Sequence, residues 1–287
     1  MSMLITKESR IIVRGIQSEV SLYHMQKMVE IGMSVVAGIL PGKGGDWILE
    51  GRIPVFDSIQ AAVDTTGADV AILFDDDSES SDGLSEAVFC EIPLIICSIR
   101  DIPIQDMLKI KRAVKERGLL LIGPDSPGIY SPERIIAGFT PEKIGIRGNI
   151  GIISSSAALG FEIISYLRLN KIGISTFIGI GEGPICGSDF DQIIPLFDAD
   201  VESKKILLID TPFGPIENLN VNQIIQSVTK PVYAYYPGSE LIESGMINLP
   251  EFVKQKRAEN FLSVRKNLVD AGIPLVTNPE KLIALLS

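Results

Sequence analysis

The chain has 287 residues, of which 46% are hydrophobic and only 6% aromatic, and its 36 acidic residues outnumber 26 basic ones to give a formal net charge of −10. This length suits two domains, and an apolar content made up mainly of Ile, Leu and Val favours parallel sheets buried on both faces over an all-helical or disordered chain. A surface of this charge repels nucleic acid and anionic lipid, so neither is expected as a partner.

The beginning of the chain and its cysteines predict the compartment. Residues 1–10 include Lys7, Glu8 and Arg10 and lack the apolar core of a signal peptide, and no later stretch approaches the ~18 apolar residues of a membrane span. The three cysteines show no CxxC spacing, so neither a disulfide framework nor a metal site is expected. We expect a cytoplasmic protein.

Short aliphatic runs alternate with segments of helical periodicity in the first half of the chain. Strand and helix in alternation indicate a doubly wound parallel sheet, and Pro103 and Gly118 mark the start and end of one helix clearly. The predicted strands are Ile11–Val13, Ser34–Ile39, Val70–Phe74, Leu94–Ser98 and Leu119–Ile122, and the predicted helices are Leu22–Ile31, Ser58–Thr65 and Ile104–Arg117.

Three loops in this half deserve comparison with anion or metal sites. The turn Arg14–Ser21 stands where a dinucleotide fold has its glycine-rich phosphate loop, but it holds one glycine and an acidic Glu19, which favours a plain turn. Pro41–Gly45 offers three glycines and Lys43 at the carboxyl edge of the sheet, and its spacing fits an anion loop and a flexible turn equally well. Asp75–Asp77 is interpreted as a solvated acidic loop rather than a metal site.

A segment rich in proline and glycine, Gly123–Arg147, predicts the connection between two domains. The alternation then resumes, which indicates a second open α/β layer. Its predicted strands are Ile150–Ser154, Ile174–Ile180, Ile206–Asp210, Val232–Tyr236 and Leu275–Thr277, and its predicted helices are Ala157–Leu169, Asp191–Asp198, Val221–Val228 and the amphipathic Phe252–Ala271.

Serine residues mark one strand-to-helix junction in this half. Ser154, Ser155 and Ser156 place hydroxyl groups beside the free N–H groups at the positive end of the next helix. This arrangement fits an anion site, and it also fits a strand end followed by an ordinary N-cap at Ser156.

Several segments occur together in a characteristic order: Val36–Gly45, Pro54–Phe56, Ile122–Gly128, Gly151–Ser154, Gly179–Gly181 and Gly187–Phe190. Over nearly the whole chain they resemble the family of the succinyl-CoA synthetase alpha subunit and its acid–CoA ligase relatives. The resemblance implies an α/β fold with an N-terminal Rossmann-like CoA-binding domain, residues 1–128, followed by a flavodoxin-like parallel-sheet ligase domain, residues 129–287.

The same resemblance implies ligands and a partner. Coenzyme A or an acyl-CoA would bind the first domain, a phosphate would face Ser154, Ser155 and Ser156, and a beta-like ATP-grasp subunit would supply the nucleotide site. The residues that map to the CoA site are Gln17, Ser18, Lys43, Ser98, Arg100 and Asp125.

One departure from the family concerns its chemistry. The family carries a phosphoryl group on a histidine in a Gly-His-Ala-Gly-like segment, where this chain has Gly238–Gly245 without histidine; the chain's one histidine, His24, belongs to the first domain. Thr211 stands where the family has a glutamate beside that histidine. A phosphoramidate needs an imidazole nitrogen, so no catalytic residue is assigned and a catalytically degenerate paralogue, a pseudoenzyme that binds CoA or a beta-like partner, is expected.

Two alternatives remain open from the sequence. The chain could be an active acyl or carbamoyl transferase or ligase that holds an acyl phosphate at Ser154–Ser156 without a histidine. It could also be an interaction or regulatory subunit that binds no small ligand.

Overall fold

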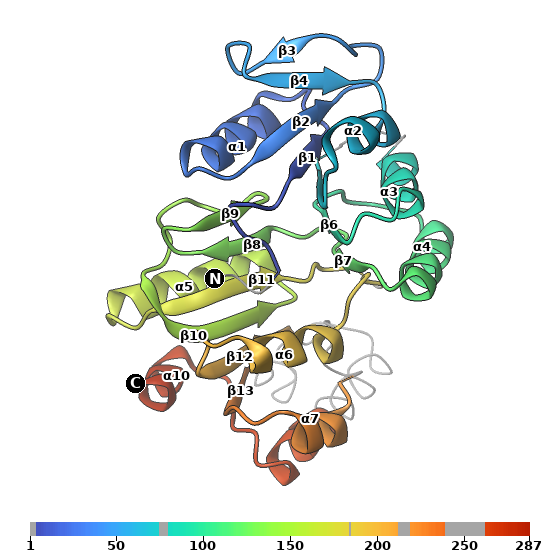
Figure 1. The fold of residues 1–287 in the computed structure, drawn as a ribbon. Helices are drawn as coiled ribbons and strands as arrows, with labels where there is room; N and C mark the ends of the chain where they lie inside the picture. The colour runs from blue at the N-terminus through green and yellow to red at the C-terminus, as the bar shows by residue number, and fades with distance from the viewer. Residues whose placement is uncertain (1–3, 75–79, 184, 212–218, 239–261) are drawn as a thin grey trace. The chain divides into compact units, whose positions relative to one another are not determined.

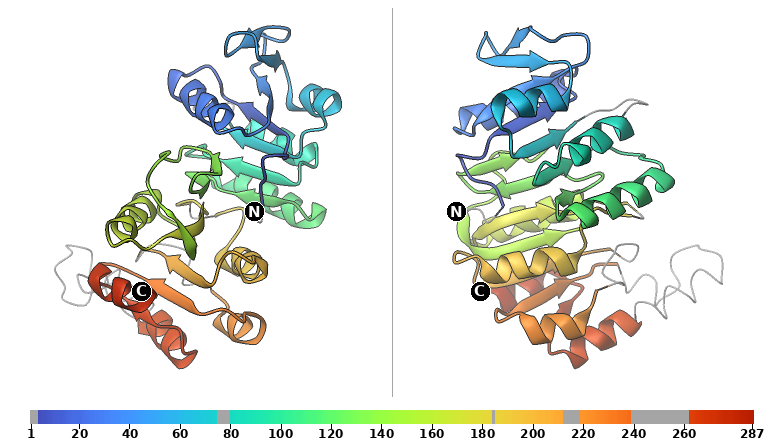
Figure 2. Two further views of the ribbon diagram at one scale, coloured as in Figure 1. Left: turned by 60° about the vertical axis from the view of Figure 1, so that its left-hand side comes forward. Right: turned by 45° about the vertical axis from the view of Figure 1, so that its right-hand side comes forward.

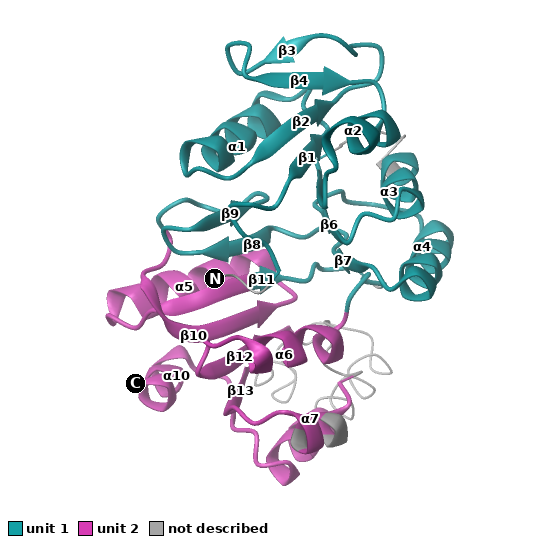
Figure 3. Ribbon diagram, in the orientation of Figure 1, with its two compact units in different colours: residues 1–143, 178–188 teal, residues 144–177, 189–287 magenta. Residues whose placement is uncertain are grey.

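The computed structural model describes residues 4–74, 80–183, 185–211, 219–238 and 262–287. The acidic run Asp75–Asp77, the segment Gly238–Gly245 beyond its first residue, and the first part of the helix predicted over Phe252–Ala271 lie outside these residues. The chain divides into two compact units, residues 1–143 with 178–188 and residues 144–177 with 189–287 (Figure 3).

The first unit is built on a seven-stranded sheet. Its strands are β1 Ile11–Arg14, β2 Val35–Ile39, β3 Trp47–Ile48, β4 Ile53–Phe56, β5 Val70–Leu73, β6 Leu94–Cys97 and β7 Leu120–Ile122. Their order is β3-β4-β2-β1-β5-β6-β7, and all neighbours are parallel except β3 and β4 (Figure 1). The strand order reverses between β1 and β5, and in folds of this kind ligands bind at the carboxyl edge beside such a reversal.

Helices cover both faces of this sheet. They are α1 Glu19–Glu30, α2 Ile59–Thr66, α3 Ser80–Phe89 and α4 Ile104–Arg117. α1 lies on one face and α2, α3 and α4 lie on the other (Figure 2). All residues of β1, β5 and β6 are therefore buried. Gly118 ends α4 with a φ of 67°, as the sequence predicts for a glycine at this position.

The second sheet has the order β14-β13-β12-β10-β11-β8-β9, where the strands are β8 Gly128–Ser131, β9 Ile135–Ala137, β10 Arg147–Ser154, β11 Ile174–Gly179, β12 Lys205–Ile209, β13 Val232–Tyr235 and β14 Leu275–Val276. The helices that follow β9 in the chain are α5 Ala157–Leu169, α6 Phe190–Ala199, α7 Val221–Ser227 and α10 Pro279–Leu286, and residues 262–270 are also helical. α5 packs with α10, and α6 packs with α7.

Two mostly parallel sheets with helices confirm the expected α/β fold. The segment Gly123–Arg147 differs from its prediction as an irregular connection, because it contains β8 and β9, an antiparallel pair. These strands have only four and three residues, too few to produce a visible periodicity among prolines and glycines. α3 and α10 are also absent from the predicted elements.

The predicted domain boundary after residue 128 stays a proposal. The second sheet receives its first strand at Gly128, which agrees with that boundary. The compact units divide after Lys143 instead, and residues 178–188 belong to the first unit.

Candidate functional site

The six residues expected at the CoA site lie in loops at one edge of the first sheet. Gln17 and Ser18 follow β1, Lys43 follows β2, Ser98 and Arg100 follow β6, and Asp125 follows β7. Because these strands are parallel, their carboxyl ends meet at the same edge. The structure therefore brings these loops to one side of the unit.

The turn after β1 is an ordinary helix start. Gly15 has a φ of 85°, and the Ser18 hydroxyl accepts a hydrogen bond from the Ser21 amide at 3.0 Å, which caps α1. The hydroxyl groups of Ser18 and Ser21 also lie 2.7 Å apart. Gln17 is exposed beside this cap. Ser18 is thus engaged in capping, and Gln17 is exposed together with Ser18, Glu19 and Val20.

The loop Pro41–Gly45 does not present a row of open amides. The amide of Lys43 donates to the Leu40 carbonyl at 3.1 Å, and that of Gly45 donates to the Val55 carbonyl at 3.0 Å. The Gly44 amide donates to the Asp57 carboxylate at 2.8 Å. These three amides already donate within the protein, so they are not available to bind a phosphate. The group of this loop that can contact an anion is the exposed Lys43 side chain.

An ion pair joins the loops that follow β6 and β7. Arg100 Nε lies 2.8 Å from Asp125 Oδ1, and 75% of the Arg100 side chain is exposed. Asp125 has a φ of 52° and its amide donates to the Ile99 carbonyl at 2.8 Å, so the backbone fixes its place. The buried Ser98 hydroxyl makes no hydrogen bond to a described residue. These loops offer one guanidinium and one hydroxyl to a ligand.

Arg14 is a buried cation at the same edge. From the sequence it is only the first residue of a turn, but in the structure it ends β1 beside β5 and is 7% exposed. Its guanidinium lies against Gly83 of α3, where a side-chain carbon would overlap it. Gly83 is the sequence feature that permits this approach of side chain to backbone, but α3 is not among the predicted helices, so the sequence alone does not indicate it.

At the carboxyl edge of the second sheet, the three serines predicted as a phosphate site are buried and close together. The Ser154 hydroxyl donates to the Ser156 carbonyl at 2.7 Å, and the Ser155 hydroxyl bonds to the carboxylate of Asp210. Ser156 is the N-cap of α5 but its side chain makes no capping bond. The sequence predicts Asp210 as the end of a strand and gives it no role in this site; in the structure it is fully buried and directly follows β12.

A tyrosine ends the neighbouring strand β13. Burial raises the pKa of Tyr235, and the carboxylate of Glu162 raises it further. The phenol is therefore neutral at pH 7 and adds no charge to this edge.

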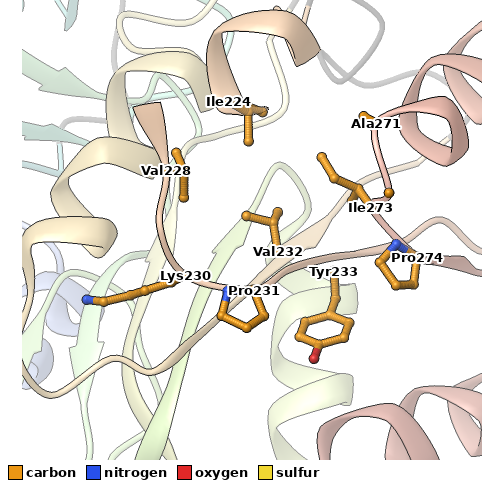
Figure 4. Close-up of a pocket in the computed structure, with 10 residues that line it drawn as sticks. Ile224, Val228, Lys230, Pro231, Val232, Tyr233, Ala271, Ile273 and Pro274 are labelled. Carbon is orange, nitrogen blue, oxygen red and sulfur yellow. The ribbon is translucent and has the colours of Figure 1, made fainter. Parts of the chain in front are cut away.

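A cavity of about 350 Å³ lies elsewhere in the second unit, at the amino ends of β13 and β14 (Figure 4). Aliphatic side chains line it, including Ile224, Val228 and Val232. The Lys230 amine turns away and donates to the Phe197 carbonyl at 2.8 Å. Without convergent polar groups this cavity does not have the character of a catalytic site.

The described residues show neither a metal site nor a membrane-spanning helix. Within the described residues, no cluster of three or more His, Cys, Asp or Glu side chains could hold a metal ion. Across the same residues, none of the helices has the length and apolar character needed to cross a membrane.

Comparison with known proteins identifies the family and the type of the first domain. Residues 6–100 match the model of the CoA binding domain family, which confirms the expected domain type. The succinate–CoA ligase [ADP-forming] subunit alpha of Staphylococcus aureus is 33% identical over 238 residues, which cover 83% of this chain and 78% of that subunit. The corresponding Staphylococcus epidermidis subunit is 32% identical over the same length.

Solved structures share the fold at lower identity. ATP citrate lyase from Methanothrix soehngenii, in complex with citrate and coenzyme A, has a TM-score of 0.81 at 18% identity, and the match covers 99% of this chain and 50% of that one. The dinucleotide-forming acetyl-coenzyme A synthetase 1 from Ca. Korarchaeum cryptofilum has a TM-score of 0.76 at 18% identity, covering 96% and 59% of the two chains. This chain thus spans half to three fifths of these larger proteins.

Proposed function

Because the chain belongs to the succinate–CoA ligase alpha subunit family, we propose that its first unit binds coenzyme A or an acyl-CoA and that the chain has lost phosphohistidine chemistry. The observation that carries the proposal is the single histidine in 287 residues. His24 lies in α1 of the first unit, with its ring 5.0 Å from that of Phe139 and 5.3 Å from that of Tyr23. A half-buried imidazole packed among aromatic rings suits a structural role.

The CoA part of the proposal rests on the first sheet. The match to the CoA binding domain family and the gathering of Lys43, Arg100 and Ser98 at one edge support it. Lys43 and Arg100 would contact phosphate groups, and Gln17, Ser18, Ser98 and Asp125 would contact the rest of the ligand through hydrogen bonds. With Arg100 already paired to Asp125, we expect weak binding.

Calorimetric titration with CoA tests this part. We expect a heat of binding that Lys43→Ala weakens at least several-fold, since the variant loses the exposed cation of the loop after β2. Lys109→Ala is the matched control, because Lys109 is an exposed lysine on α4 whose partner is Asp106. No heat with CoA, acetyl-CoA or succinyl-CoA would refute CoA binding and favour a ligand-free regulatory subunit.

A phosphorylation assay tests the loss of chemistry. The chain, with a succinate–CoA ligase beta subunit as proposed partner, is incubated with labelled ATP or GTP. We expect no acid-labile phosphate on the chain. Stoichiometric acid-labile labelling that His24→Gln abolishes would place a phosphohistidine at His24 and would overturn this part of the proposal.

One observation favours acyl or carbamoyl transfer as a second candidate. α5 begins without a side-chain cap from Ser156, so the first turn of the helix and the Ser156 hydroxyl could meet an acyl phosphate. Turnover of acetyl phosphate or carbamoyl phosphate, abolished by Ser154→Ala with Ser156→Ala, would support this candidate. Turnover that survives both substitutions would mean that other residues carry the reaction.

A further inference from the structure

The start of α5 in the second unit adjoins a buried pair, Ser155 and Asp210, which lies outside the CoA site proposed for the first unit. β10 and β12 run side by side in parallel, with Ser154 opposite Ile209. Ser155 and Asp210 are therefore the next pair in register, and the Ser155 hydroxyl bonds to the Asp210 carboxylate. The backbone holds both residues in place, because the Ser155 amide donates to the Ile209 carbonyl at 3.1 Å and the Asp210 amide donates to the Tyr235 carbonyl at 3.1 Å.

Asp210 meets the requirements of a buried negative charge. Its side chain is 0% exposed, so the carboxylate has lost contact with bulk water. A buried carboxylate needs hydrogen-bond donors and nearby positive charge. The Ser155 hydroxyl is such a donor, and one residue further along the chain Ser156 opens α5, whose N-terminus carries a partial positive charge.

The helix in turn lacks the usual local partner. Ser156 is its N-cap residue but makes no side-chain capping bond. The first turn of a helix is stabilised by a nearby negative charge, and Asp210 is held next to this turn through Ser155. The same charge repels any other anion that approaches the first turn.

We propose that Asp210 is a specificity-determining residue that supplies the anion for the start of α5 and thereby excludes phosphate and acyl phosphates from this edge of the second sheet. A phosphate at the α5 N-terminus would lie close to the buried carboxylate, because Ser155, which bonds to Asp210, directly precedes the N-cap residue Ser156. Like charges at such a separation weaken binding by roughly tenfold to a hundredfold. The three serines then form a structural junction instead of a phosphate site, which argues against acyl or carbamoyl transfer at the start of α5.

Asp210→Asn tests the proposal in the full chain. Asparagine keeps the shape and an oxygen that can accept from Ser155 but removes the charge. Titration with inorganic phosphate should give no saturable binding to the wild-type second unit and at least about tenfold tighter binding to the variant. Amide hydrogen exchange locates the ion, because bound phosphate should protect residues 157–160, whereas phosphate in the first unit would not.

Asp200→Asn is the matched control. Asp200 is also buried, at 7% exposed, and accepts from a serine hydroxyl, that of Ser203 at 2.6 Å, but lies at the opposite end of β12. Asp200→Asn changes the net charge by the same amount as Asp210→Asn and should leave phosphate binding unchanged. Equal gains in both variants would refute the assignment to Asp210.

A second variant covers the case in which Asp210→Asn does not fold. Replacing both members of the pair, Ser155→Ala with Asp210→Ala, removes the charge together with the hydroxyl that bonds to it and should gain the same protection at residues 157–160. The proposal is overturned when wild-type protein shows this protection in phosphate, or when a folded variant gains none. Neither result depends on whether CoA binds the first unit.

Discussion

Gly83 has no side chain, and this leaves room in α3 for the buried guanidinium of Arg14. Glycine inside a helix costs about 0.5–1 kcal/mol relative to alanine, so Gly83→Ala would ordinarily stabilise α3. Here the added carbon overlaps the guanidinium of Arg14. We therefore expect the opposite sign, a loss of roughly 1–3 kcal/mol in the free energy of unfolding, measured by urea denaturation.

The matched control for this substitution is Ser85→Ala. Ser85 is an exposed residue of the same helix, so alanine there should leave the stability unchanged or raise it by a few tenths of a kcal/mol. A stabilised Gly83→Ala variant would mean that Arg14 moves away at no cost. In that case the contact does not fix the position of the guanidinium.

Substitution of Arg100 should affect CoA binding without affecting the stability of the fold. Its ion pair with Asp125 is largely exposed, and pairs of this kind contribute about 0–1 kcal/mol to folding. Arg100→Ala should therefore change the urea midpoint little, while lowering CoA affinity measured by calorimetry at least several-fold. The reverse pattern, a clear loss of stability with unchanged affinity, would remove Arg100 from the proposed site.

At the scale of whole elements, the sequence predicts the bounds of a helix or strand best where residues at its own ends define them. The helix Ile104–Arg117 has the bounds predicted for it, because Pro103 and Gly118 define its ends. α3 was missed because its first turn is rich in Ser and Asp and contains Gly83, which are poor helix signals. The bond between Asp57 and Gly44 and the pair Ser155–Asp210 could not be predicted, since they depend on which strands become neighbours.

The packing of α1 should make folding sensitive to pH. His24 on α1 contacts the rings of Tyr23 and Phe139, and its Nδ1 is buried without a hydrogen-bond partner among the described residues. Burial lowers the pKa of His24. Between that lowered value and about 6.5, the unfolded chain binds more protons than the folded one, so stability falls as the pH drops through this range.

His24→Gln should remove this part of the pH dependence. Urea unfolding at pH values of about 7.5 and 5 measures it, and the wild type should lose more stability than the variant between them. Lys27 of α1 lies 4.0 Å from Glu142, and both residues are present in both proteins, so their interaction cancels in the comparison. The effect should be modest, because the imidazole is only half-buried. Identical losses would mean that protonated His24 is accommodated without strain.

At the scale of the molecule, the net charge of −10 opposes the polyanionic ligand that the local cations of the first unit would attract. The two effects have different ranges: the repulsion acts over tens of ångströms at about 0.01 M salt, whereas contacts of Lys43 and Arg100 act at short distance. Added salt therefore weakens the long-range repulsion before it weakens the short-range contacts. The association rate of CoA should therefore rise with ionic strength, in contrast to electrostatically steered binding.

Stopped-flow measurement at several salt concentrations checks this expectation, with pantetheine as the control ligand. Pantetheine has the same thiol arm without the phosphates, so its association rate should hardly respond to salt. The dissociation rate of CoA should rise with salt as the short-range ion contacts weaken. An association rate that falls with salt would show that positive charge at the sheet edge outweighs the field of the whole chain. Lys43→Ala should then abolish that salt dependence, because it removes the exposed cation of the loop after β2.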